Sequence, residues 1–259
     1  MDALPIWAVL LFTVSVVLVA IEMGFQAGQW RSRSRAFDSE AQLSAMTGAH
    51  LALLAFIMAF SFSLAAGHYT ERKRLLLAEA NSIETTYLRA GLIQHEEGQN
   101  IARLLESYTA LRAEMATTVV SDLAQALTRS EEIHEQLWAE ARKIAAYDNP
   151  NVLDSLLIQS INQLFDLHNE RVAAGLRSRV PPSIWIVVAM LLILSMTGIG
   201  YFSGVKGNRN PVASTGLALS FSLVLFLIAD LDRPISGMVK TDHSAMLELN
   251  QRLNGPAER

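Results

Sequence analysis

An apolar stretch from Ala49 to Ala66 runs directly into a charged segment, and this junction constrains the fold more than any other feature of the sequence. The stretch AHLALLAFIMAFSFSLAA is almost wholly apolar, and as a helix at about 1.5 Å per residue it crosses roughly the hydrocarbon core of a bilayer. The following segment GHYTERKR ends in consecutive charged residues, and placing charged side chains in lipid costs free energy. Further on, apolar residues keep a helical spacing at Leu75, Leu76, Ala80, Ile83, Tyr87 and Leu88. The pattern predicts one helix that leaves the membrane and continues in water.

Three other apolar runs are also long enough to span a membrane. With the second span at about 46–67, the predicted transmembrane helices are about 4–22, 46–67, 183–203 and 211–231. The first run lacks a preceding basic segment and a following Ala-x-Ala site, so we interpret it as a retained span and not as a signal peptide. A polar connector, Gln26 to Gln42, is expected to loop back into the second span.

The segment between the second and third spans is expected to be an extramembrane helical bundle. Apolar residues recur there at helical spacing, Glu96 and Glu97 suit a helix start, and Asp148-Asn149-Pro150-Asn151 is a strong break. The predicted organisation is therefore residues 1–67 with two spans, 68–180 as the helical domain, 181–233 with two spans, and 234–259 as a polar C-terminal tail. This is an all-α integral membrane protein with four transmembrane helices.

The balance of acidic and basic residues limits which partners this helical domain is expected to bind. Residues 68–180 hold 16 acidic and 12 basic residues, so no basic excess suggests binding to nucleic acid. The chain has no cysteine, which excludes disulfides, thiolate nucleophiles and cysteine-based metal sites. An even number of spans places both termini and the helical domain on one side. Basic residues near the span ends number eight on that side and five on the other, which favours a cytoplasmic domain, although the first loop alone favours the reverse.

Patterns typical of enzymes are weak throughout the chain. Glu131-x-x-His134 has the spacing of a di-iron ligand pair, but such sites need a second motif of this kind and two further carboxylates, so a solvated helix face is expected. His68 and Glu71 could share a metal, and His50 could serve a pore or a proton relay, but each is more typical of a membrane interface. No phosphate-binding loop, dinucleotide fingerprint or nucleophile elbow is present. We expect no catalytic residues, no metal and no cofactor.

Small residues form a stripe along one face of the second span. They recur as Ala52, Ala55, Ala59, Ser63 and Ala66, and the opposite face is expected to carry Leu53, Ile57, Phe60 and Leu64. Such a stripe allows close helix packing in lipid or lines a symmetric pore. Because channels also use hydrophobic constrictions, Phe56 and Phe60 are rival pore-facing residues. The pore-lining candidates are Ala52, Ala55, Phe56, Ala59, Phe60 and Ser63.

A charged motif follows the last span. Asp230, Asp232 and Arg233 precede Pro234-Ile235-Ser236-Gly237. The motif either ends the helix at the water boundary, or forms a charged collar at the mouth of a vestibule or an ion pair that joins subunits. Together with residues at the exit of the second span, the candidate membrane-exit set is Tyr69, Glu71, Arg72, Asp230, Asp232, Arg233, Pro234 and Gly237.

Two of these stretches resemble the bestrophin-like family of four-span membrane proteins, which is distantly related to the bestrophin ion channels. The first runs from Leu54 through Tyr69-x-Glu71-Arg72-Lys73-Arg74 to Ala90, and the second is Asp230 to Gly237. The resemblance implies a pentamer whose second span lines a narrow neck and continues into a cytosolic domain. It places the neck on Ala55, Ala59 and Ser63, where bestrophins carry bulky apolar residues, and places Arg72 where they carry tryptophan. A calcium clasp cannot be assigned.

Two functions from different classes follow. The first is a homo-oligomeric, pentameric ion channel of the inner or plasma membrane, lined by the second span, with a weak preference for anions that comes from the resemblance alone. Its partners are the lipid bilayer, further copies of the chain and the permeant ions. The second is a non-conducting membrane scaffold or signalling adaptor whose helical domain binds a soluble partner. An exposed apolar stripe on residues 101–146 would favour the second function.

Overall fold

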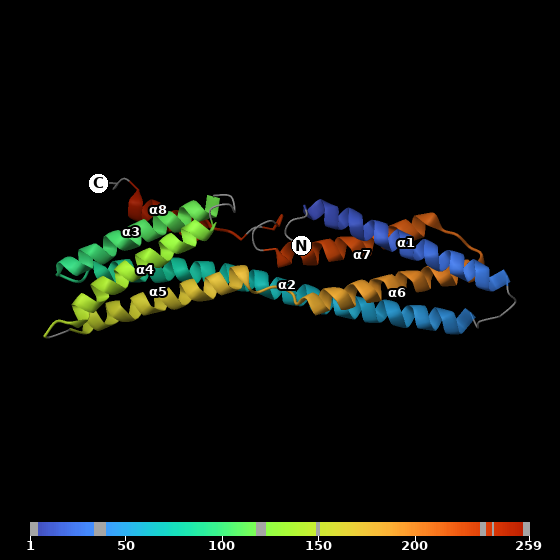
Figure 1. Ribbon diagram of the computed structural model, residues 1–259, viewed down its shortest axis with the longest axis horizontal. Helices are drawn as coiled ribbons and strands as arrows, with labels where there is room; N and C mark the ends of the chain where they lie inside the picture. Colours follow the sequence, from blue (N-terminus) through green and yellow to red (C-terminus); the bar gives the residue numbers. More distant parts are fainter. Residues whose placement is uncertain are drawn as a thin grey trace. The chain divides into compact units, whose positions relative to one another are not determined.

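The protein is described by a computed structural model of residues 5–33, 40–117, 123–148, 151–233, 237–239 and 241–255. Every regular element in these ranges is an α-helix, which confirms the predicted fold class. The chain forms two compact units, the first from residues 1–69 and 179–240, the second from residues 70–178 and 241–259. Helix α2 (Glu40–Ala90) supplies residues to both units and is continuous through Gly67 (Figure 1).

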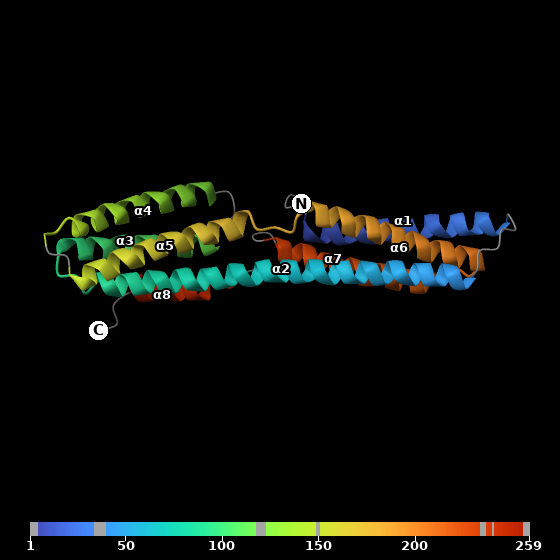
Figure 2. The same ribbon diagram turned by 90° about the horizontal axis from the view of Figure 1, so that it is seen from below.

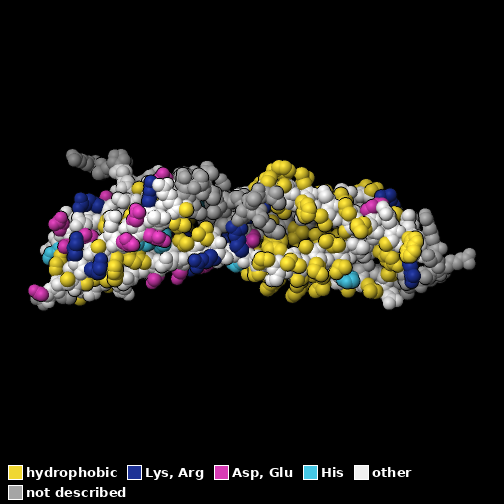
Figure 3. Space-filling model, viewed as in Figure 1, with side chains coloured by type: hydrophobic (Ala, Val, Ile, Leu, Met, Phe, Trp, Pro, Cys, Tyr) yellow, Lys and Arg dark blue, Asp and Glu magenta, His cyan; other side chains and the backbone are white. Residues whose placement is uncertain are grey.

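The first unit contains α1 (Ile6–Arg33), α6 (Pro182–Lys206), α7 (Pro211–Asp232) and the N-terminal part of α2. Among the described residues, four helices are long and apolar enough to cross a membrane, as the hydropathy of the sequence predicted. Hydrophobic side chains cover the visible face of this unit (Figure 3), and large ones such as Phe12 and Ile186 are more than half exposed. An apolar outer surface of this kind is stable in lipid and not in water.

Glycines bring α1 and α6 into backbone contact. A Cβ atom added to Gly24 would lie 2.0 Å from the carbonyl oxygen of Thr197, and one added to Gly200 would lie 2.0 Å from that of Ile21. One turn further along each helix, Gly28 and Gly204 are equally crowded, at 2.2 Å from a facing carbonyl oxygen. The two Gly-x-x-x-Gly pairs therefore interlock, an arrangement by which transmembrane helices gain close packing.

The predicted connector between the first two spans is partly wrong. Helix α1 continues past Glu22 to Arg33, and α2 begins at Glu40, so much of Gln26 to Gln42 is helical. The physical reason is the contact with α6, because Gly28 lies beyond the apolar run and still packs against the backbone of Tyr201. Tertiary packing stabilises this polar extension of α1 where hydropathy alone predicted a loop.

The second unit packs α3 (Glu96–Thr117), α4 (Leu123–Ala145) and α5 (Val152–Leu176) around the C-terminal part of α2. Its core contains Ile83, Leu105, Leu137 and Leu164, one from each of these helices, and all four are fully buried. Helix α5 begins with a capping box, in which the side chain of Asn151 accepts from the Asp154 N–H and that of Asp154 accepts from the Asn151 N–H. Asn149 and Pro150 of the predicted break lie outside the described residues.

The polar C-terminal tail is expected from the sequence to be adherent or frayed, and residues 244–254 are adherent. They form helix α8 (Ser244–Asn254), which lies beside the C-terminal part of α2 (Figure 2). Met246 and Leu249 are each 1% exposed in the core of the second unit, and Arg252 pairs with Glu84 of α2 at 2.6 Å. The apolar residues of α8 have a spacing of three or four, a short amphipathic pattern that the average polarity of the tail obscured.

Candidate functional site

The six pore-lining candidates lie on the side of α2 that the chain itself leaves uncovered. Ala52, Ala55, Phe56, Ala59, Phe60 and Ser63 are all exposed. Leu54, Met58, Ser61 and Ala65 are at most 3% exposed and pack against the rest of the first unit. At about 100° per residue the two sets point in opposite directions around the helix. The small-residue stripe and the two phenylalanines therefore share one face.

The face opposite the small stripe is not the one predicted from the sequence. Leu53 and Phe60 are exposed, and Ile57 and Leu64 are only partly buried. The residues that contact the rest of the first unit include a serine and an alanine, Ser61 and Ala65. Hydrophobic size did not identify the packing face because both faces of a transmembrane helix meet apolar surroundings.

The carboxylates at the end of α7 bind backbone amides. Asp230 is 1% exposed, and its Oδ1 and Oδ2 accept from the N–H groups of Met238 at 2.6 Å and Val239 at 2.9 Å. Asp232 is 8% exposed, and its Oδ1 accepts from the N–H of Val180 at 2.7 Å. Each carboxylate thus joins the end of α7 to another segment of the first unit. Both carboxylates therefore stabilise the fold of the first unit.

Gly237 completes this turn because it has no side chain. A Cβ atom there would lie 2.8 Å from the carbonyl oxygen of Asp230 and 3.1 Å from its Oδ1. The structure therefore brings Asp230 and Gly237 of the predicted motif together. Arg233 is 4% exposed, and Pro234 lies outside the described residues.

The other members of the membrane-exit set divide between the two units. Tyr69 is partly buried against the core of the first unit. Glu71 and Arg72 belong to the second unit, where Glu71 accepts two hydrogen bonds from Arg74 on an exposed surface and Arg72 is 7% exposed. The Arg74 guanidinium, through hydrogen bonding and charge, lowers the pKa of Glu71. This pair is a local helix interaction at i and i+3.

A buried ionic cluster at the centre of the second unit was not predicted. Glu79 of α2 is fully buried, and Tyr108 of α3 donates to its Oε1 at 2.7 Å. Arg112 Nη2 lies 3.1 Å from Oε1, and Arg171 of α5 pairs with Oε2. Because the Tyr108 hydroxyl donates to Glu79, its oxygen accepts from His168 Nδ1, at 2.9 Å. One carboxylate thus joins three helices.

The charges in this cluster shift the pKa values of Glu79 and Tyr108. Although burial alone would raise the pKa of Glu79, Arg112 and Arg171 hold that pKa well below its usual range. Burial, together with the Glu79 charge, raises the pKa of Tyr108 well above its usual range. A carboxylate with two guanidinium groups leaves one net positive charge inside the unit. Arg112 Nε is buried without a hydrogen-bond partner among the described residues.

His134 of α4 adjoins this cluster, contrary to the expectation that it lies on a solvated face. Its ring lies 4.5 Å from that of Phe165 and 4.6 Å from that of His168, between centroids. Burial, and then the charges of His168 and Arg112, lower the pKa of His134 to about 4. Glu131, its partner in the predicted spacing, is exposed. Within the described ranges no group of three or more residues could hold a metal ion.

A sequence signal for the ionic cluster does exist. Glu79 lies four residues before Ile83 and four after Leu75, so it occupies a core position on an otherwise apolar helical stripe. Arg112 follows Tyr108 by four residues in the same way, and Arg171 follows His168 by three. A charged residue at a core position requires a partner of opposite charge. Sequence alone does not show which of several charges meet.

Comparisons with known proteins agree with this architecture. The family described as Bestrophin-like domain matches residues 9–246. Two structures of a bacterial bestrophin homologue from Klebsiella pneumoniae, each carrying a different mutation, superpose with a TM-score of 0.67 at 16% identity. The first match covers 97% of this chain and 99% of the homologue's chain, and the second covers 98% of each chain. A third structure, described only as a membrane protein, gives a TM-score of 0.65 at 16% identity, with coverages of 97% and 98%. No curated protein matches the chain.

Proposed function

The chain belongs to the bestrophin-like family, and on this basis we propose that it forms a homo-oligomeric ion channel whose pore is lined by α2. The observation that carries the proposal is the exposure of all six candidate residues on one face of α2, while the opposite face packs within the chain. A pore around a symmetry axis needs such a face, because each copy must present side chains that its own fold leaves uncovered. Five copies are proposed from kinship with the bestrophins.

The chemistry of this face determines the kind of pore. Ala55, Ala59 and Ser63 present methyl groups and one hydroxyl, so a ring of them leaves a wide passage that water can enter. Phe56 and Phe60 are 67% and 56% exposed on the flank of the same face. If they turn to the axis, they narrow the passage and favour gating by dewetting. The preference for anions is proposed from kinship, since the acidic residues of the helical domain favour cations.

The proposed topology places both termini and residues 68–180 in the cytoplasm of a cell, at its inner or plasma membrane. The eight basic residues near the span ends on that side support this orientation. In this proposal the second unit forms a cytosolic vestibule.

The test is ion flux through liposomes that contain the purified oligomer. Ala59→Trp and Ser63→Trp place an indole on the proposed pore face and should reduce flux at least tenfold. Ile186→Trp is the matched control, because Ile186 is 60% exposed on α6 and lies outside the proposed pore face of α2. Ion flux through the control variant should equal the flux through the natural protein. Ion-tight liposomes with an intact oligomer, or equal losses in all three variants, would refute the proposal.

The scaffold alternative finds little support in the second unit. Within the described side chains of residues 101–117 and 123–146, one large hydrophobic residue is exposed. This residue is Trp138, which is 39% exposed. The apolar residues of α3 and α4 pack instead into the common core. An apolar docking stripe is therefore not presented by the described parts of these two helices.

A further inference from the structure

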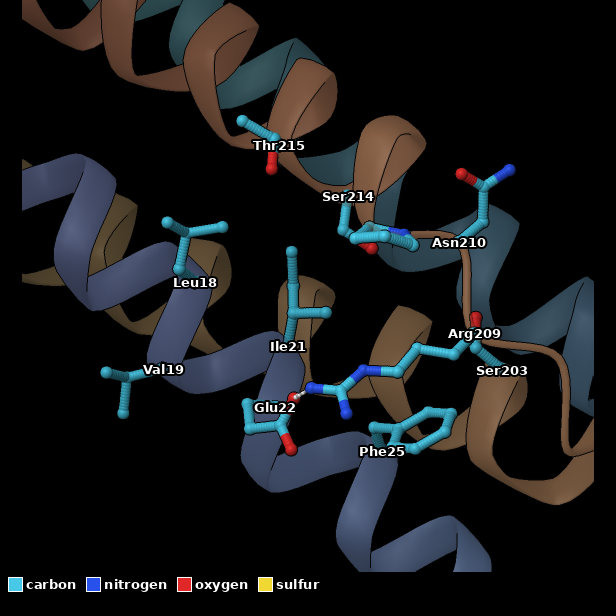
Figure 4. Close-up of a pocket in the computed structure, with 11 residues that line it drawn as sticks. Leu18, Val19, Ile21, Glu22, Phe25, Ser203, Arg209, Asn210, Ser214 and Thr215 are labelled. Carbon is cyan, nitrogen blue, oxygen red and sulfur yellow. Dashed lines mark hydrogen bonds and ion pairs between the residues drawn. The ribbon is translucent and has the colours of Figure 1, made fainter.

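A cleft of about 380 Å³ lies in the first unit between α1, α7 and the turn that joins α6 to α7. Figure 4 shows Leu18, Ile21, Glu22 and Phe25 on α1, with Ser214 and Thr215 of α7 across the gap. Its size suits a segment of an acyl chain or a small amphiphile. The cleft is separate from the exposed face of α2.

The polar and apolar walls of the cleft lie at different positions along α1. Glu22 follows the apolar run of α1, and Arg209 lies in the turn between two spanning helices, so both charges belong at the boundary between lipid and water. Leu18 and Val19 lie one turn earlier on α1, deeper in the apolar part, and are 37% and 57% exposed. A ligand that matches both walls has a charged head and an apolar tail.

The charged end of the cleft presents both signs. Arg209 Nη2 donates to Glu22 Oε2 at 2.6 Å, and Gln26 Nε2 donates to the other carboxylate oxygen at 3.1 Å (Figure 4 shows the pair). The guanidinium also lies over the Phe25 ring, at 5.4 Å from its centroid. The side chains of Arg209 and Glu22 are 63% and 41% exposed. Ion pairs this exposed contribute little to stability, so a ligand can exchange into them at small cost.

We propose that this cleft binds one phospholipid whose headgroup carries both a phosphate and a primary amine, as phosphatidylethanolamine does. Arg209 binds the phosphate through its planar donors, and Glu22, held by Gln26, accepts from the ammonium. One acyl chain lies along Leu18 and Ile21 against α7. The quaternary amine of a choline headgroup has no N–H to donate, and a glycerol headgroup has no positive charge, so both lack one of the two contacts.

This inference depends on the membrane-spanning fold and does not require conduction. The test is native mass spectrometry of the delipidated oligomer, titrated with ethanolamine, choline and glycerol phospholipids of identical acyl chains. The ethanolamine lipid should bind at least fivefold more tightly than the other two. Glu22→Gln should remove that preference, and Arg209→Gln should weaken binding of all three lipids.

Matched controls separate this site from nonspecific lipid. Glu84→Gln and Arg252→Gln break an equally exposed ion pair in the second unit and should leave lipid binding unchanged. Leu18→Trp fills the cleft without touching either charge and should weaken all three lipids. Equal affinity for the three headgroups in the natural chain, or unchanged binding in both Glu22→Gln and Leu18→Trp, would overturn the proposal. Failure of all three lipids to bind the intact oligomer would overturn it as well.

Discussion

Replacing Glu79 by glutamine should destabilise the second unit far more than replacing any exposed charged residue of that unit. The variant keeps the size of the side chain but removes the counter-charge shared by Arg112, which is 2% exposed, and Arg171, whose side chain is 16% exposed. Removal of one partner from a buried ion pair costs about 3–5 kcal/mol. At about 1.4 kcal/mol per tenfold change, the opening equilibrium of this unit should rise by roughly two to four decades.

The measurement is hydrogen exchange by mass spectrometry on the purified protein, resolved by peptide. Backbone amides of α3 and α5 near the cluster should exchange faster in Glu79→Gln by that factor, while those of α1 and α6 in the first unit should not change. Glu84→Gln is the matched control on the same helix, where loss of an exposed pair costs less than about 1 kcal/mol. Equal exchange in the two variants would show that the buried pair contributes no net stability, and the reasoning would fail.

Three further substitutions test other contacts. Gly24→Ala should lower the melting temperature by several degrees, since its Cβ meets a carbonyl oxygen and overpacking costs about 1–3 kcal/mol, whereas Gly216→Ala, with open space around it, should not. The pKa of His134 is about 4 when folded and 6.5 when unfolded, so stability should fall as the pH drops from 6.5 towards 4. His134→Phe should show a smaller acid loss in melting experiments, by about 2 kcal/mol after allowance for partial exposure, and equal losses would contradict this. Asp230→Ala should accelerate hydrogen exchange at Met238 and Val239, whose N–H groups lose their acceptors at a cost of about 1–3 kcal/mol each, and unchanged exchange there would count against these bonds.

The spans could be predicted from the sequence because length and hydropathy determine them directly. The helices of the second unit could be predicted too, since their apolar stripes repeat with a helical period and Asn151 marks a start. The glycine contacts at Gly24 and Gly200 were missed, although each begins a Gly-x-x-x-Gly pair. The pattern shows that a helix can approach a neighbour closely, but it does not say which neighbour, so the α1–α6 pairing needed the structure.

The ionic cluster was missed for a different reason. Glu79, Arg112 and Arg171 are far apart in the sequence and come from three helices, so their association depends on how the bundle is packed. Average composition made the second unit resemble an ordinary solvated bundle. The core position of Glu79 on its helix was the one local sign that this carboxylate is buried.

Helix α2 follows different rules of burial in its two parts. Before Tyr69 its buried and exposed positions are both apolar, as Leu54 and Phe56 are, because lipid and protein interior are equally apolar. After Tyr69 buried residues such as Ile83 alternate with exposed polar ones such as Asn81, because water now covers the outer face. Hydrophobicity therefore identifies the packing face of α2 better in the second part, although Leu77 and Leu88 are exposed there and Glu79 is buried. In the first part, where the pore is proposed, the packing face follows from contacts within the unit, and the face left uncovered is the one that carries the small residues.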